Sequence, residues 1–189
     1  MQLLQAILQF KKEVKDLKDY IVLVRVNSAN YQKTNIRILK LLVKEQKIPG
    51  VYVTLNKPFD VIQRLLDKEE IDSRLIIFID AITKVSENKK EKNCLFIGSP
   101  EKLSDISVAM DQAVKALPAK DKFIFFDSIN TLGLFNQPGT VARFLYFLSG
   151  KIREWKIKGI IISVKKESDA GMLNELSQLC DAEIDFGGK

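Results

Sequence analysis

The sequence predicts an α/β fold in which helices cover a mostly parallel central sheet. Seven short segments rich in β-branched and aromatic residues alternate along the chain with segments of helical periodicity. The short segments are almost continuously apolar, as strands are when both faces of their sheet are covered. Breakers such as Pro49–Gly50 and Pro138–Gly139 fall between the segments, where alternating strands and helices need turns.

The predicted strands share short length and near-continuous apolarity. They are residues 20–26, 50–55, 74–79, 93–97, 122–126, 159–164 and 182–186. Ligands of parallel α/β sheets bind beyond the carboxyl ends of the strands. We therefore expect functional residues immediately after these segments.

The predicted helices lie between the strands. They are residues 2–17, 34–47, 58–67, 103–117, 141–155 and 168–179. The first helix is amphipathic, with Ile7 and Phe10 on its apolar face. We expect that face to pack on the core of its own chain; a partner subunit is the alternative.

Length and composition bound the organisation. The 189 residues fit one domain, and we assign 1–189 to it, with the helix of residues 1–18 preceding the core. Histidine is absent, which excludes imidazole bases, Ser-His-Asp or Cys-His nucleophiles and histidine metal ligands. Cys94 and Cys180 are too few for a four-cysteine zinc site.

The sequence gives weaker evidence on the location of the protein and on its partners than on its organisation. No apolar run is long enough to span a bilayer, and residues 1–10 have neither the basic start nor the apolar core of a secretory signal. We therefore expect a cytoplasmic protein with reduced thiols and no membrane contact. The formal charge is +6, but lysines dominate and acids are interspersed among them. A nucleic acid partner is therefore not expected, since such faces carry more arginine and interleaved aromatics.

The segment after the first strand resembles a phosphate-binding loop that has lost its glycines. In the pattern G-x-x-x-x-G-K-[ST], backbone N–H groups wrap phosphates, the lysine meets them and the hydroxyl holds Mg²⁺. Here Lys33 and Thr34 occupy the last two places, whereas Asn27 and Gln32 stand where the glycines belong. The first glycine of the chain is Gly50. A nucleotide bound here would meet the segment Asn30, Tyr31, Gln32, Lys33 and Thr34.

A second partial motif follows the strand at residues 122–126. This apolar run ends in Asp127, the position at which a P-loop carboxylate binds the Mg²⁺ shell. Thr34 and Asp127 are thus the candidate Mg²⁺ ligands, provided that nucleotide binds. A carboxylate that caps a turn at the strand end is the alternative for Asp127. The same alternative applies to Asp80, which would otherwise have to point at the water that attacks the nucleotide.

The order of these motifs resembles a known family. The run FIFFDSINTLGLF at residues 123–135, the altered loop, Pro138–Gly139 before a helix ending near Trp155, and GIIISVKKES at residues 159–168 carry the resemblance. Together they are similar to the RecA/KaiC-type P-loop ATPases, and most to small archaeal KaiC-like proteins, over residues 20–186. The resemblance implies a three-layer αβα RecA-like P-loop fold, ATP binding and ring assembly among relatives.

The resemblance also implies roles for particular positions. It places the strand of Ser163 between those that lead to Lys33 and Asp127, and aligns Ser163 with the position that senses the γ-phosphate. KaiC-like ATPases typically end their second core strand with a pair of glutamates, one of which activates water. Asn56 and Lys57 occupy the matching places here.

These departures predict a catalytically degenerate RecA/KaiC-like domain. We expect a pseudo-ATPase that acts as a regulatory or scaffold module, through a protein partner or self-association. One alternative is an ATP-binding protein with little or no hydrolysis, for which ATP and Mg²⁺ would be the cofactors. Another is a DNA-associated recombinase-like accessory protein, whose candidate contact would be the loop at residues 130–139.

Overall fold

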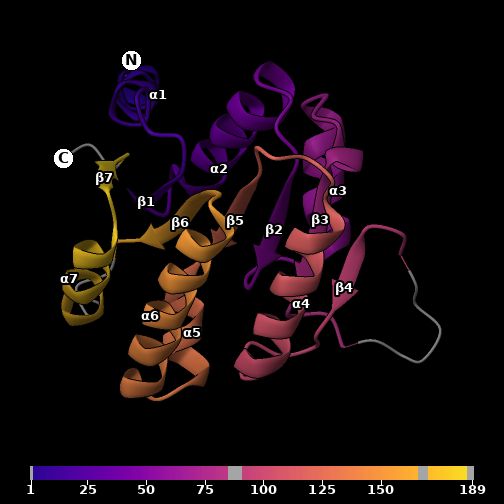
Figure 1. Cartoon of the computed structure of the whole chain (residues 1–189), viewed down its shortest axis with the longest axis vertical. Coiled ribbons are helices and arrows are strands. Elements are labelled where there is room, and N and C mark those ends of the chain that lie inside the picture. Colours follow the sequence, from indigo (N-terminus) through magenta and orange to yellow (C-terminus); the bar gives the residue numbers. More distant parts are fainter. Residues whose placement is uncertain (1, 85–90, 166–169, 187–189) are drawn as a thin grey trace.

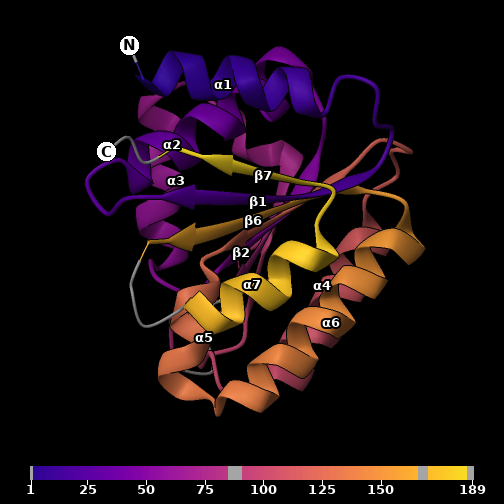
Figure 2. The same ribbon diagram turned by 90° about the vertical axis from the view of Figure 1, so that its left-hand side faces the viewer.

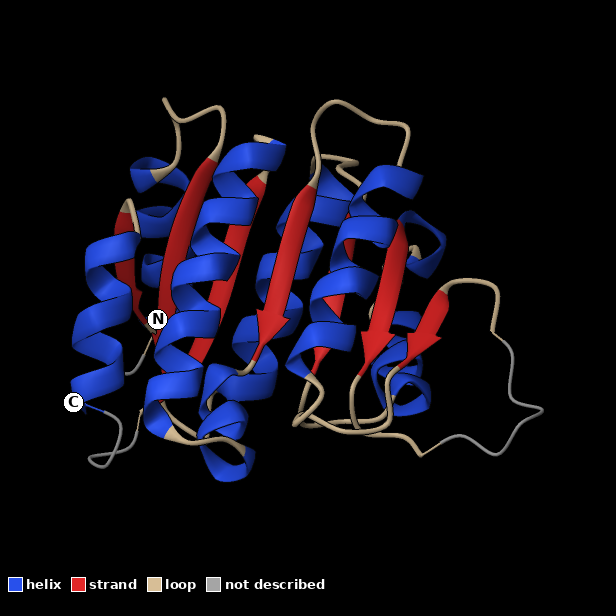
Figure 3. Cartoon of the chain, turned by 60° about the horizontal axis from the view of Figure 1, so that its bottom comes forward, coloured by secondary structure: helices blue, strands red, loops and turns tan. Residues whose placement is uncertain are grey.

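The computed structural model describes residues 2–84, 91–165 and 170–186, and its centre is a parallel sheet (Figure 1). Within that part of the chain the sheet has seven strands in the order β4-β3-β2-β5-β6-β1-β7. Their bounds are β1 Tyr20–Val26, β2 Gly50–Thr54, β3 Ile76–Asp80, β4 Cys94–Phe96, β5 Phe123–Asp127, β6 Lys158–Val164 and β7 Ala182–Asp185. Every pairing is parallel, so all the strands end at one edge (Figure 3).

Helices cover both faces of the sheet. They are α1 Gln2–Glu13, α2 Tyr31–Leu39, α3 Phe59–Lys68, α4 Leu103–Ala116, α5 Ile129–Phe135, α6 Pro138–Trp155 and α7 Ala170–Leu179. The first three lie on one face and the last four on the other (Figure 2). A π-helix, η1 Lys40–Glu45, continues α2, and a short 3₁₀ helix, η2 Ser73–Leu75, precedes β3.

Two hydrophobic cores follow from the alternation of side chains along the strands. Val22 and Val24 of β1 pack toward α1, α2 and α3, whereas Ile21 and Leu23 pack toward the other helices. The central strands β2 and β5 are buried throughout. Burial on both faces explains why their sequences are continuously apolar and confirms the predicted three-layer arrangement.

The strand order confirms the topology that the resemblance implied. Strand β6, which carries Ser163, lies between β1 and β5. The turn before α2 and the end of β5 at Asp127 therefore sit on the same edge, one strand apart. This edge is the place to look for a functional site.

Two elements differ from the sequence prediction. Helix α2 begins at Tyr31, three residues before the expected Thr34. The expected loop at residues 130–139 instead contains helix α5 and the start of α6. The first half of α5 is buried, with Leu132 fully enclosed in the core, and only its last turn, residues 133–135, is exposed.

The helix α1 packs on its own chain. Phe10 is fully buried and meets the Tyr20 ring edge-on, with 6.4 Å between ring centroids. This contact agrees with the expectation that the apolar face of the first helix completes the core. Within the described residues, no helix combines the length and apolarity needed to cross a bilayer.

Candidate functional site

The candidate site lies where β1, β2 and β5 end. Residues 27–30 form a turn between β1 and α2, in which the Asn30 N–H donates to the side-chain Oδ1 of Asn27 at 2.9 Å and to its carbonyl oxygen at 3.1 Å. The helix begins immediately afterwards. The turn is therefore short and closed on itself, and it does not run around an open space as a phosphate loop does.

Asp127 is the centre of the site. It is 1% exposed, and its two carboxylate oxygens accept hydrogen bonds from two tyrosines. The hydroxyl of Tyr31, on the first turn of α2, donates to Oδ1. The hydroxyl of Tyr52, inside β2, donates to Oδ2. Both oxygens that would face a metal ion are thus engaged by the protein itself.

Asn56 extends this network toward α5. Its amide Nδ2 donates to the Tyr31 hydroxyl at 3.0 Å and to Ser128 Oγ at 2.9 Å. Its Oδ1 accepts a hydrogen bond from Thr131 Oγ1. The resemblance to KaiC-like ATPases implies that those relatives carry a glutamate at the position of Asn56. Here Asn56 holds the tyrosine and α5 in place by hydrogen bonds and offers no carboxylate for activating water.

Lys57 closes the outer side of the site. Its Nζ donates to Gln32 Oε1 at 2.6 Å and lies 6.0 Å from the centroid of the Tyr31 ring. This distance between the ammonium nitrogen and the ring centroid lies within the range of a cation–π contact. The ammonium therefore covers Tyr31 from the solvent side.

Burial dominates the electrostatics of the cluster. Desolvation raises the pKa of Asp127 above its usual value, although hydrogen bonds from Tyr31, Tyr52 and Asn35 and the charge of Lys57 oppose the shift. Desolvation and the neighbouring Asp127 charge raise the pKa values of Tyr31 and Tyr52 well above their usual range. Both phenols are therefore neutral donors at physiological pH.

The space beside Asp127 is almost filled. The cavity that touches it, lined by side chains of α2, β2 and α3, has a volume of about 10 Å³. A single water molecule needs at least about 10–15 Å³ of such space, and Mg²⁺ usually keeps several waters. The residues present therefore do not fit a magnesium nucleotide at Asp127 in this arrangement.

Lys33 lies away from this cluster. Two helical positions correspond to a rotation of about 200°, so Lys33 is on the opposite side of α2 from Tyr31. Its exposed side chain lines a groove of about 460 Å³ between α2 and α3, together with Arg37 and Lys68. The structure thus separates Lys33 from Asp127, whereas it brings Tyr31 onto Asp127 and Gln32 onto Lys57.

The two hydroxyl residues that the sequence predicts for the nucleotide site, Thr34 and Ser163, are buried and make no side-chain hydrogen bond within the described residues. Thr34 and Ser163 are both 0% exposed, and neither hydroxyl oxygen has a hydrogen-bond partner among the described residues. Side-chain alternation along β6 directs Ser163 to the face of Ile161, whereas Asp127 shares the face of Phe125. Ser163 and Asp127 therefore lie on opposite faces of the sheet.

The side chain of Asp80 stabilises the turn that directly follows β3. Its carboxylate accepts hydrogen bonds from the N–H groups of Phe59, Ile82 and Thr83 at 2.8–2.9 Å and from the Thr83 hydroxyl at 2.6 Å. The three bonds from Ile82 and Thr83 close the turn that follows β3, and the bond from Phe59 holds β3 to the start of α3. The alternative considered for Asp80, a cap at a strand end, agrees with this geometry.

Sequence reasoning missed Tyr52, Asn35 and Thr131 as members of the site. Tyr52 offered one signal, since it is the residue with a polar tip in the middle of a strand that is otherwise buried and apolar. A buried tyrosine hydroxyl needs a partner. The sequence does not say which one, because Asp127 is 75 residues away.

Comparison with known proteins shows the fold. Neither a protein-family model nor a curated protein sequence matches this chain. Among solved structures, the chain is similar to a KaiC-like protein from the hyperthermophilic archaeon Pyrococcus horikoshii OT3. The TM-score is 0.62 at 18% identity, over 88% of this chain and 70% of the other. The likeness extends over most of the chain and shows a three-layer α/β RecA-like fold.

Proposed function

We propose that this chain is a RecA/KaiC-like domain that has lost nucleotide chemistry and acts through contacts with other proteins. The observation that carries the proposal is the engagement of both Asp127 oxygens by Tyr31 and Tyr52. In a working P-loop domain the carboxylate at this position serves Mg²⁺. Here the tyrosine hydroxyls occupy the positions that ligands of the metal shell would need.

The replacement of the phosphate loop supports the same proposal. The short Asn27–Asn30 turn uses the Asn30 N–H internally, and Lys33 lies on the outer side of α2. A cradle of N–H groups and a lysine directed at the phosphates are what P-loop chemistry requires. Asn56 and Lys57 supply no general base.

A role in protein contact is supported by exposed apolar side chains. Nine large hydrophobic residues are exposed in the described part of the chain, and four of them lie on α5 and α6. These four are Leu134, Phe135, Tyr146 and Phe147. Single exposed apolar residues are ordinary, but groups of them mark surfaces that meet other proteins.

The decisive experiment is thermal unfolding with and without millimolar Mg-ATP. A ligand that binds only the folded state at a hundredfold excess over Kd stabilises it by about 2.7 kcal/mol. We expect the unfolding midpoint of the wild-type protein to stay unchanged. A rise that the variant Lys33→Ala abolishes would contradict the proposal.

A variant can test whether Tyr31 itself closes the site. Tyr31→Ala removes the ring and the hydroxyl beside Asp127 and leaves Lys33, Thr34 and Asp127 in place. If the tyrosine is the obstacle, Mg-ATP should stabilise this variant and still not affect the wild type. Tyr146→Ala, which truncates a tyrosine that is 71% exposed, is the control and should respond like the wild type.

Nucleotide binding without turnover is the second candidate function. It is favoured by Thr34, whose buried hydroxyl lacks a partner among the described residues, because an unsatisfied buried hydroxyl costs free energy. A Mg²⁺-bound state in which Tyr31 swings out would give that hydroxyl a ligand. A Mg-ATP-dependent rise in the midpoint of the wild-type protein, lost in Thr34→Val, is the outcome specific to this candidate.

A further inference from the structure

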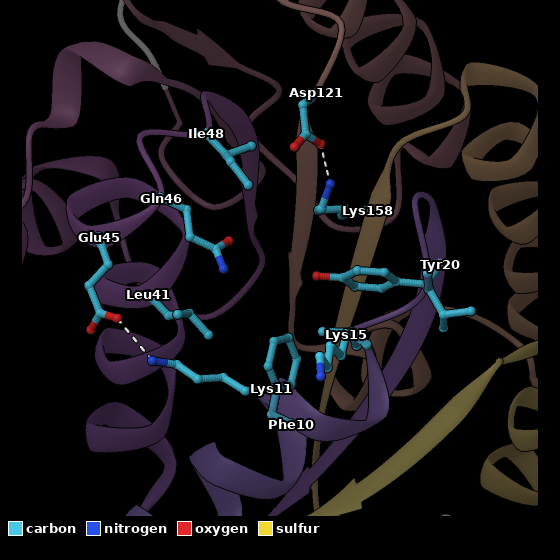
Figure 4. Close-up of a pocket in the computed structure, with 12 residues that line it drawn as sticks. Phe10, Lys11, Lys15, Tyr20, Leu41, Glu45, Gln46, Ile48, Asp121 and Lys158 are labelled. Carbon is cyan, nitrogen blue, oxygen red and sulfur yellow. Dashed lines mark hydrogen bonds and ion pairs between the residues drawn. The ribbon is translucent and has the colours of Figure 1, made fainter.

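The amino ends of the strands, opposite to the Asp127 edge, carry two adjoining hollows. The first has a volume of about 510 Å³ and lies between α1, the end of η1 and the starts of β1 and β6 (Figure 4). The second, of about 930 Å³, lies between the segment before β5 and the turn from α6 to β6. Asp121 and Lys158 line both, so the two hollows meet at this ion pair, and we call them together the amino-end groove.

The amino-end groove concentrates positive charge. Its lining includes eight cationic side chains and three carboxylates, whereas the whole chain has an excess of only six cations. The cations are Lys11, Lys15, Lys18, Lys120, Lys122, Arg153, Lys156 and Lys158, and the carboxylates are Asp19, Glu45 and Asp121. The lining residues therefore carry five more cations than carboxylates.

Half of these cations are engaged within the fold. Lys158 pairs with Asp121, Lys11 pairs with Glu45 at 3.0 Å and Arg153 pairs with Asp181 at 3.1 Å. Lys122 donates to a backbone carbonyl at 2.8 Å. The other four have no ion pair within the described residues and are exposed: Lys15, Lys18, Lys120 and Lys156.

The groove also has an apolar component. Val14 and Leu17 line the first hollow beside the buried Phe10, and Trp155 lines the second. Figure 4 shows the Tyr20 hydroxyl directed into the first hollow, between Lys15 and the Asp121–Lys158 pair. Each hollow therefore combines cations with aliphatic or aromatic side chains.

We propose that the amino-end groove binds an acidic, amphipathic segment of a partner protein. This inference rests on the proposed function and names the chemistry of the partner. Glutamate and aspartate side chains would meet the free lysines, and the apolar side of the segment would cover Val14, Leu17 and Trp155. Complementary charge of this kind steers association and fixes which partner binds.

A protein segment fits these residues better than a nucleic acid does. Seven of the eight cations are lysines, and the single arginine is held by Asp181 and by the carbonyl of Leu179. Faces that bind single-stranded nucleic acid combine such cations with exposed aromatic platforms on which the bases stack. The exposed aromatics Phe135, Tyr146 and Phe147 lie on α5 and α6 and do not line the groove.

Trp155 provides the readout, because it is the one tryptophan of the sequence. The full-length chain is titrated with a synthetic helical peptide that carries leucines on one face and glutamates elsewhere, and that contains no tryptophan. A peptide with lysine in place of glutamate is the reference. We expect the acidic peptide to change the Trp155 fluorescence and to bind at least tenfold more weakly at high salt. The lysine peptide should not bind.

Charge-reversal variants locate the site. Lys15→Glu with Lys120→Glu reverses one free cation in each hollow, and we expect at least a tenfold loss of peptide affinity. Arg37→Glu with Lys68→Glu makes the same change of charge in the groove between α2 and α3, and should alter affinity less than twofold. Thermal unfolding of each variant verifies that it is folded.

Three outcomes would overturn the proposal. Equal losses in the two double variants would show that only bulk charge matters, and no binding of the acidic peptide would remove the site. Tighter binding of single-stranded oligothymidylate than of the acidic peptide would assign the groove to nucleic acid. None of these results depends on Mg-ATP, so failure here is distinguishable from failure of the proposed loss of nucleotide chemistry.

Discussion

The buried carboxylate of Asp127 is held in place by two tyrosine hydroxyl groups. Its two oxygens accept from Tyr31 and Tyr52, and desolvation raises its pKa despite these donors. When the folded-state pKa of an acid exceeds its unfolded value, the folded state binds more protons between the two values. The free energy of unfolding then falls as pH rises through that interval.

The variant Asp127→Asn should remove this pH dependence. We expect the wild-type free energy of unfolding, relative to the variant, to fall as pH rises from below the ordinary aspartate pKa of about 4 toward neutrality. Urea unfolding at several pH values measures the difference between the two proteins. A difference that stays constant over this range would show that Asp127 is not perturbed by burial.

Gly50 shows how closely two strands approach at the centre of the sheet. It stands opposite Phe123 in the parallel register of β2 and β5. A Cβ at Gly50 would lie 2.4 Å from the Phe123 ring, which is fully buried. The absence of a side chain at Gly50 is therefore what allows the ring to pack there.

The variant Gly50→Ala should destabilise the protein by about 1–3 kcal/mol, the usual cost of overpacking a core. Gly150→Ala is the matched control, because Gly150 is an exposed helical position of α6 where an added methyl group would meet no atom within 4 Å. That change should stabilise the protein by about 1 kcal/mol through helix propensity. Urea denaturation of the two variants would refute the packing argument if both moved in the same direction.

At the scale of elements, the strands were predictable and the residues around Asp127 were not. Continuous apolar runs identified all seven strands, and each predicted boundary lies within a few residues of the observed one. Such runs reflect burial on both faces, which is a local property of sequence. The hydrogen bond between Tyr31 and Asp127 joins residues 96 positions apart in the sequence. The periodicity of apolar residues gives no information about a contact between such distant positions.

For helices α2 and α5 the local sequence pattern led to a wrong prediction. The Lys33–Thr34 pair suggested that α2 begins at Thr34, as it would after a phosphate loop, but Asn27 and Asn30 close a shorter turn and the helix begins at Tyr31. In α5, Asn130, Thr131 and Gly133 are weak helix formers. That segment is helical because Ile129 and Leu132 are buried in the core and Asn130 bonds the backbone of Val164.

Helix α1 contributes Phe10 to the hydrophobic core, beside the smaller buried side chains of Ala6 and Ile7. Phe10 is fully buried against Tyr20, whereas Leu8 of the same helix is 57% exposed. Phe10→Ala should lower the free energy of unfolding by about 3–5 kcal/mol. Leu8→Ala should change it by no more than about 0.5 kcal/mol. Equal effects, measured by urea denaturation, would show that α1 does not pack on the core.

At the scale of the whole molecule, strand β1 finds its hydrogen-bonding partners in the last two strands, β6 and β7. Strand β1 pairs only with β6 and β7 within the described residues, so its neighbours lie more than 130 positions later in the sequence. Pairings between distant segments carry a large entropic cost of loop closure and fold slowly. The fold is therefore completed by its carboxyl-terminal third.

A truncated chain tests this dependence. A fragment ending at Trp155 lacks both strands that pair with β1, and we expect it to remain unfolded, with little protection of amide hydrogens from exchange. A fragment ending at Cys180 lacks only the edge strand β7 and should keep protected amides in β2, β5 and β6. Protected β2 and β5 amides in the shorter fragment would show that part of the sheet folds without β6.

The position of β1 has a consequence for synthesis on the ribosome. The apolar run Tyr20–Val26 is translated before both of its partner strands, which follow more than 130 residues later. During that interval the run is an unpaired strand of high β-propensity, the kind of segment that associates with other chains. Cellular yield of this protein should therefore depend on how fast translation proceeds and on chaperones that shield nascent chains.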